Sequence, residues 1–129
     1  MTATHPPRIV RIGLAGLGNV GLGVFINLEK NRGLLRERTG FDLTITRVAV
    51  RDPGKQRGIA PGSAALTADW RELVADPGID IMVELIGGTT EAFDLVCAAL
   101  RARKPVVTGN KALLAERGPD RRLVEVEDL

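Results

Sequence analysis

Residues 9–21, near the amino terminus, decide the fold, and their sequence is IVRIGLAGLGNVG. The first part, Ile9 to Ala15, is an apolar run rich in β-branched residues, which predicts a buried strand. Glycines follow at positions 16, 18 and 21. Beyond that point, apolar residues recur at the spacing of one helix face, at Val20, Val24, Phe25 and Leu28. The stretch therefore predicts a strand, a glycine-rich turn and a helix over about residues 19–30, in that order.

The glycines have the spacing G-x-G-x-x-G, which is a weak signal alone but typical of a dinucleotide-binding turn between a strand and a helix. Gly16 would permit the tight turn, and Gly18 would let the backbone approach a pyrophosphate. Gly21 would let the helix pack close to the strand. The N–H groups of the first helical turn would then face the phosphate. A glycine-rich turn without a ligand is the alternative interpretation.

Strand and helix patterns alternate along the rest of the chain. Further strands are predicted at residues 43–50, 79–86 and 106–108. A short helix is predicted after Asp69, which has Glu72 at the spacing of a reciprocal cap, and others begin at Thr90 and near residue 112. Residues 31–40 form a polar connection or an extension of the first helix. Alternation of this kind predicts parallel pairing through right-handed crossovers. We therefore expect a Rossmann-like, doubly wound α/β sheet in a single three-layer αβα domain over residues 9–118, with a flexible leader (1–8) and a divergent tail (119–129).

Composition excludes several classes of protein. The chain has 129 residues, 44% apolar and 26% charged, which rules out disorder and is too short for a dehydrogenase with its own substrate domain. A net charge of +2 is too small for a nucleic-acid surface. No apolar run approaches the ~20 residues that span a bilayer. The single cysteine, Cys97, is expected in the core, and a reducing, cytoplasmic location is expected. His5 has no neighbour with which to share a metal, so no metal site is predicted.

Basic residues follow the second predicted strand, where the adenosine ribose of a bound dinucleotide lies. The sequence there is Val50-Arg51-Asp52, with Lys55 and Arg57 shortly after. An arginine at this place suits a 2′-phosphate, whereas an acid suits a free 2′-hydroxyl. Because Arg51 comes first, the sequence favours NADP, although Asp52 leaves NAD open. An ordinary charged turn is the alternative interpretation.

The third predicted strand ends at the crevice where open α/β sheets bind ligands. Gly87 and Gly88 would let the backbone pass close to a cofactor, and Thr89 or Thr90 can cap the following helix. Glu84 lies inside the strand, which favours a paired structural carboxylate over a catalytic one.

Lys111 comes just after the fourth predicted strand, so it would point towards the same crevice. A lysine there can hydrogen-bond a carbonyl substrate or move a proton. An ordinary surface lysine is the alternative, and these observations leave both open.

Four segments together resemble a known family: GLGNVG (16–21), VAVRD (48–52), VELIGG (83–88) and VVTGNKALLA (106–115). In this order and spacing they are similar to the N-terminal cofactor domain of homoserine dehydrogenase. The resemblance covers roughly residues 8–118, and the last two segments are its most specific part. Related dehydrogenases of the sugar oxidoreductase type usually carry Glu-Lys-Pro where this chain has residues 109–111, which argues against them.

The resemblance implies that the full enzyme interconverts aspartate 4-semialdehyde and homoserine with NAD(P), in the aspartate-family route to threonine and methionine. Arg51 would lie near the adenosine ribose, and residues 87–89 and 108–111 along the nicotinamide side. Lys111 matches a lysine held to assist proton transfer, and is therefore the candidate catalytic residue. The implied cofactor-binding residues are Gly16, Gly18, Asn19, Val20, Gly21, Arg51, Gly87, Gly88, Thr89, Thr108, Asn110 and Lys111.

The sequence also departs from the family. Gly109 stands where alanine or proline is usual, and the sequence after Pro119 does not resemble the helix that continues the family's cofactor domain. The family's substrate domain carries a second catalytic lysine, the carboxylates that bind the substrate amine and a monovalent cation site. We expect this domain to be missing from the chain. We therefore expect a truncated product, inactive alone, that meets an amino-acid substrate only with that domain. The alternatives are a stand-alone NAD(P)-sensing or partner-binding module and a scaffold that only dimerises; a homodimer stays open.

Overall fold

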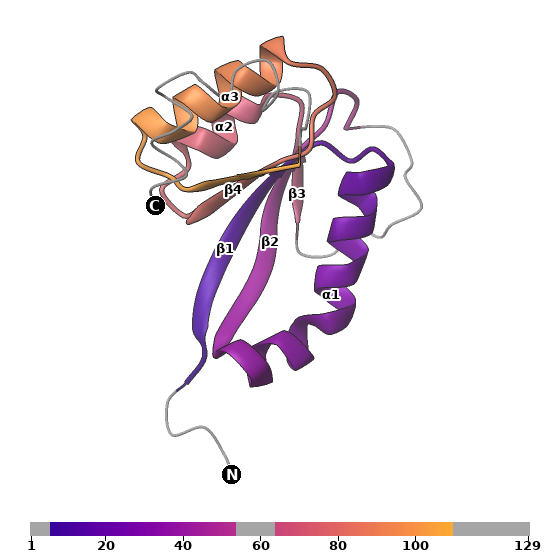
Figure 1. Cartoon of the computed structure of the whole chain (residues 1–129), viewed down its shortest axis with the longest axis vertical. Helices are drawn as coiled ribbons and strands as arrows, with labels where there is room; N and C mark the ends of the chain where they lie inside the picture. The colour runs from indigo at the N-terminus through magenta and orange to yellow at the C-terminus, as the bar shows by residue number, and fades with distance from the viewer. Residues whose placement is uncertain (1–5, 54–63, 110–129) are drawn as a thin grey trace.

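A computed structural model describes residues 6–53 and 64–109 of the chain. In these ranges five parallel strands form one sheet in the order β3-β2-β1-β4-β5. Helix α1 covers one face of the sheet, and α2 and α3 cover the other (Figure 1). The strands are β1 (Arg8–Ala15), β2 (Phe41–Ala49), β3 (Ala65–Thr67), β4 (Ile81–Glu84) and β5 (Val106–Thr108), and the helices are α1 (Asn19–Thr39), α2 (Trp70–Ala75) and α3 (Thr90–Arg101). The predicted three-layer, doubly wound sheet is confirmed.

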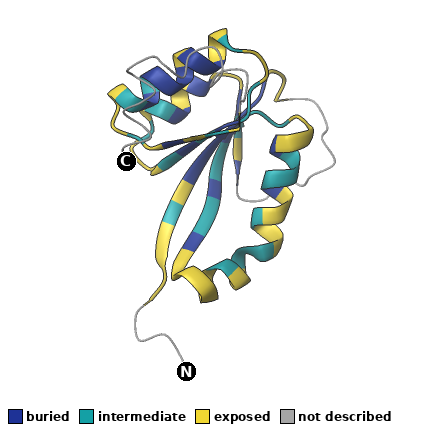
Figure 2. Cartoon of the chain, viewed as in Figure 1, coloured by how far each residue is buried: buried dark blue, intermediate teal, exposed yellow. Residues whose placement is uncertain are grey.

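Two apolar clusters hold the layers together, one on each face of the sheet. On the α1 face, Phe25 packs with Leu14 and Ile45 of the central strands. On the other face, α3 presents the apolar side that its sequence predicts, and half of its residues are buried (Figure 2). Cys97 belongs to this second cluster and is only 4% exposed, so the expectation of core packing is confirmed.

Helix α1 is longer than the predicted residues 19–30, because the polar connection that follows is also helical. The helix ends at Gly40, whose φ of 77° is left-handed and whose N–H donates to the carbonyl of Arg36. Arg32, beyond the predicted end, donates to both carboxylate oxygens of Asp42 on β2, at 2.5 and 3.0 Å. This contact ties the extension to the sheet and comes from tertiary structure rather than from helical periodicity.

The Arg32–Asp42 pair makes stability depend on pH. The hydrogen bonds from Arg32 lower the pKa of Asp42 below its ordinary value, against the opposing effect of burial. In the unfolded chain the pKa of an aspartate is about 3.9, so a lower pKa in the folded state stabilises the fold at pH values above about 3.9. This stabilisation is lost as the pH falls through the pKa of the folded state. We expect Asp42→Asn to lower the urea midpoint at pH 7 and to approach the wild-type midpoint below about pH 4. A difference that stays constant with pH would contradict this assignment.

Helix α2 begins as predicted at Asp69, whose carboxylate accepts from the N–H of Arg71 at 2.9 Å. The predicted reciprocal bond from Glu72 is wrong. The Glu72 carboxylate instead accepts from the hydroxyl of Thr67 on β3, and that hydroxyl accepts from the N–H of Asp69 at 3.3 Å. The cap is thus shared with the neighbouring strand.

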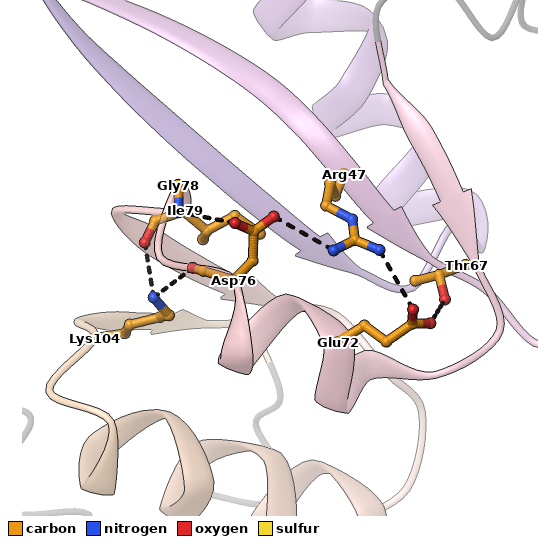
Figure 3. Close-up of polar contacts among 7 residues, drawn as sticks. All are labelled: Arg47, Thr67, Glu72, Asp76, Gly78, Ile79 and Lys104. Carbon is orange, nitrogen blue, oxygen red and sulfur yellow. Dashed lines mark hydrogen bonds and ion pairs between the residues drawn. The ribbon is translucent and has the colours of Figure 1, made fainter.

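A polar network fixes α2 to the sheet (Figure 3). The guanidinium of Arg47, on β2, lies between two carboxylates. It is 3.6 Å from a carboxylate oxygen of Glu72 in α2 and 3.3 Å from one of Asp76, the residue that follows α2. Lys104 donates to the carbonyls of Asp76 and Ile79 at 2.8 and 3.0 Å. The N–H of Gly78, and then Arg47 and Lys104, lower the pKa of Asp76. These contacts hold both ends of α2 in place.

Two smaller differences concern the strands. The third predicted strand, residues 79–86, is regular only at Ile81–Glu84, and the three-residue β3 was not predicted. The helix predicted near residue 112 and His5 lie outside the described residues. None of the helices in the described ranges is long and apolar enough to cross a membrane.

Candidate cofactor site

A pocket of about 410 Å³ opens where the strands end. Because all five strands are parallel, their carboxyl ends meet at one edge of the sheet, which is where such sheets bind ligands. Residues that directly follow β1, β2, β3 and β4 line it, together with the starts of α2 and α3. The lining residues are Gly16, Leu17, Gly18, Ala49, Val50, Arg51, Ala68, Trp70, Leu85, Ile86, Gly87 and Glu91.

Two of the predicted glycines are required by the backbone itself. Gly16 has φ of 104°, and a Cβ there would lie 2.7 Å from the carbonyl oxygen of Leu85. A Cβ on Gly21 would overlap the carbonyl oxygen of Gly16. The first turn of α1 therefore packs directly on the turn that follows β1, the close approach expected of the third glycine.

Gly18 differs from these two, because a Cβ there would meet no atom within 4 Å. Its backbone is extended, and it occupies the N-cap of α1 without a side chain to cap the helix. The first turn of α1, which contains the predicted Asn19 and Val20, holds no acidic residue. This end of the pocket thus combines free space beside the backbone with the positive end of a long helix, a combination that suits a phosphate group.

Arg51 lines the pocket and is exposed, directly after Val50, whose N–H donates to the carbonyl of Thr67 at 2.8 Å. Asp52 is exposed but is not among the lining residues. Of the two charged residues that directly follow Val50, it is therefore the cation that lines the pocket, which agrees with the NADP interpretation. Lys55 and Arg57 lie outside the described residues.

The loop after β4 also borders the pocket. Gly87 lines it, and Gly88 turns the chain away with φ of 85°. Thr89 takes the N-cap position of α3, where its carbonyl accepts from the N–H of Phe93, but its side chain makes no capping bond. Thr89 therefore occupies the predicted N-cap position, but its side chain does not cap the helix.

Glu84 is completely buried, and its carboxylate accepts hydrogen bonds from neighbouring groups. The N–H of Ile86 donates to Oε1 at 2.8 Å, and the hydroxyl of Thr108 donates to Oε2. The two side chains meet because Glu84 and Thr108 are register partners on β4 and β5. These contacts support the structural interpretation of Glu84, and the proton of the Thr108 hydroxyl is used within the sheet.

Three lining residues lie outside the sequence segments that were expected to form the site: Ala68, Trp70 and Glu91. The indole Nε1 of Trp70 donates to Oε1 of Glu91 at 3.1 Å, which joins the starts of α2 and α3. The two residues lie on different helices. The only local signal for Glu91 in the sequence is its place in the first turn of α3, where an acidic side chain interacts favourably with the helix dipole. Asn110 and Lys111 lie outside the described residues, and no group of three potential metal ligands occurs within the described ranges.

An open parallel sheet with a glycine-rich turn at a helix N-terminus, beside a pocket at its carboxyl edge, defines a Rossmann-type nucleotide-binding domain. A family profile described as "Homoserine dehydrogenase, NAD binding domain" matches residues 16–128. The chain belongs to this family.

Individual relatives agree with this assignment. The chain is 44% identical over 106 residues to homoserine dehydrogenase of Methylobacillus glycogenes, matching 82% of this chain and 26% of the relative. It is 41% identical over 109 residues to that of Pseudomonas aeruginosa, matching 84% of this chain and 25% of the relative. A crystal structure of homoserine dehydrogenase from Thiobacillus denitrificans superimposes with a TM-score of 0.83 at 38% identity, covering 94% of this chain and 28% of that one. The chain thus spans about a quarter of the length of the curated relatives that it matches.

Proposed function

We propose that the pocket binds a nicotinamide dinucleotide, NADP in preference to NAD, for a protein that interconverts homoserine and aspartate 4-semialdehyde. The observation that carries the proposal is the pairing of two features in one pocket: the open space beside Gly18 at the start of α1, and Arg51 at the end of β2. Anionic pyrophosphate fits the first feature, and a 2′-phosphate fits the second.

In this proposal the dinucleotide lies along the carboxyl edge of the sheet. With the pyrophosphate on the turn formed by residues 16–18, the adenosine ribose extends towards Arg51, and the nicotinamide extends past residues 87–89 towards the carboxyl end of β5. The bound nicotinamide supplies or accepts the hydride. The chain's own contribution is to hold the cofactor, and in this proposal Lys111 moves the proton at the substrate oxygen, a role that rests on the family resemblance.

A titration with NADPH and NADH, followed by nicotinamide fluorescence, tests the proposal. We expect saturable binding of both, with the tighter binding for NADPH. Absence of saturable binding for either nucleotide would overturn the proposed function, and tighter binding of NADH would overturn the preference for NADP.

Arg51→Ala is expected to weaken NADPH binding by about ten- to a hundredfold and to leave NADH nearly unchanged. A hydrogen bond to a charged group contributes about 1.5–3 kcal/mol, and only NADPH carries the 2′-phosphate that Arg51 would pair. Dissociation constants for both nucleotides measure the effect, and Asp52→Asn is the matched control because Asp52 does not line the pocket. Equal losses for both nucleotides would place Arg51 away from the 2′-phosphate.

A further inference from the structure

One wall of the pocket is left over once the phosphate and ribose contacts are assigned. It consists of Ala68, which follows β3, and of Trp70 and Glu91, which lie at the starts of α2 and α3. Trp70 is only 5% exposed, whereas Glu91 is exposed at the start of α3. This wall is therefore mostly apolar, with one carboxylate at its edge.

The Glu91 carboxylate is held in a defined place. Its Oε1 accepts from Trp70 Nε1 at 3.1 Å, and Oε2 accepts no hydrogen bond from the described residues. Trp70 is the first residue of α2, and the contacts of Thr67 and Arg47 with Glu72 brace that helix against the sheet. The guanidinium of Arg71 stacks over the indole at 4.7 Å from its ring centroid. One carboxylate oxygen is thus positioned by the protein while the other stays available to a ligand.

The chemistry of this wall matches one end of the proposed cofactor. When the pyrophosphate lies at Gly18 and the ribose near Arg51, the purine is the part that remains to meet this wall. An ionised carboxylate only accepts hydrogen bonds. The exocyclic 6-amino group is the hydrogen-bond donor that an adenine base offers when it is attached to ribose. We propose that Glu91 recognises this amino group and makes the site selective for 6-aminopurine over 6-oxopurine dinucleotides, with Trp70 as its positioning residue.

The inference rests on the proposed function, and a purine exchange tests it. NADPH and its reduced hypoxanthine counterpart differ at the purine ring, where the second carries an oxygen at position 6 and a proton on N1. Both are titrated against the complete chain by nicotinamide fluorescence. We expect wild type to bind NADPH at least tenfold more tightly, because the 6-oxygen would face the carboxylate and a hydrogen bond to a charged group would be lost.

Variants assign the selectivity to the two residues. Glu91→Gln is expected to bring the two affinities within about threefold of each other, because its amide can both donate and accept. Trp70→Phe keeps an aromatic ring but removes the Nε1 donor, and is expected to reduce the selectivity while circular dichroism stays unchanged. Asp94→Asn, an exposed carboxylate on the same helix that does not line the pocket, is the matched control and should leave the ratio at the wild-type value.

The outcomes separate the two proposals. If both nucleotides bind wild type equally, or if Glu91→Gln keeps the full selectivity, the assignment of Glu91 is overturned while dinucleotide binding stands. If neither nucleotide binds, the proposed function fails and the inference fails with it.

Discussion

Gly18→Val is expected to abolish dinucleotide binding, with affinity falling by at least about a hundredfold, in a chain that stays folded. In the structure the space beside Gly18 is open, with no atom within 4 Å of a Cβ placed there, and its backbone is extended. A valine side chain therefore fits the protein but fills the space in which a pyrophosphate would meet the backbone. Because valine is a poorer N-cap than glycine, a loss of about 1 kcal/mol in stability is expected.

Other glycines of the same region serve as controls. Gly23 also has open space around it and lies inside α1, so Gly23→Ala should leave binding intact and stabilise the helix by about 1 kcal/mol. Gly21→Ala should instead lower the melting temperature, since its Cβ would overlap the carbonyl of Gly16. Nicotinamide fluorescence gives the affinities, and circular dichroism gives the stabilities. Wild-type binding by Gly18→Val would show that the turn is not the phosphate site.

The sheet and its glycine-rich turn could be predicted from the sequence because both depend on local patterns. Apolar runs separated by helical segments predict parallel strands. The spacing of the glycines is informative because they begin directly after the strand that ends at Ala15 and continue into the first turn of the helix. The geometry of Gly16 and Gly21 agrees with the roles expected of them. The Arg51 prediction also depended on one fact alone, that the residue follows a strand whose carboxyl end faces the crevice.

Features that depend on contacts distant in the chain could not be predicted in this way. The part of α1 beyond residue 30 is held against the sheet by the contact of Arg32 with Asp42, and the cap of α2 depends on the contact of Thr67 with Glu72. Trp70 and Glu91 meet because α2 and α3 lie side by side on one face of the sheet (Figure 1). Periodicity indicates which face of a helix is buried, but it does not indicate which polar side chain on a neighbouring element will be its partner.

The 129-residue chain by itself is expected to show no measurable oxidation of homoserine and no reduction of aspartate 4-semialdehyde. Hydride transfer requires the substrate carbon within about 3–3.5 Å of the nicotinamide, and this positioning accounts for a large share of the barrier reduction. The described pocket lies along the carboxyl edge of the sheet, where we propose that the dinucleotide binds. The chain matches only about a quarter of the relatives named homoserine dehydrogenase, so the residues that would hold the substrate are expected in their remaining length.

A chimera makes this expectation testable. Joining the chain to the remainder of the Methylobacillus glycogenes relative should yield NADPH-dependent turnover, measured as the change in nicotinamide absorbance with saturating aspartate 4-semialdehyde. Lys111→Ala in the chimera should then lower kcat by about 10²–10⁴-fold, the usual contribution of a positioned proton donor. Turnover by the unfused chain that disappears in Lys111→Ala would contradict this expectation, because it would mean that these 129 residues already place a substrate against the nicotinamide.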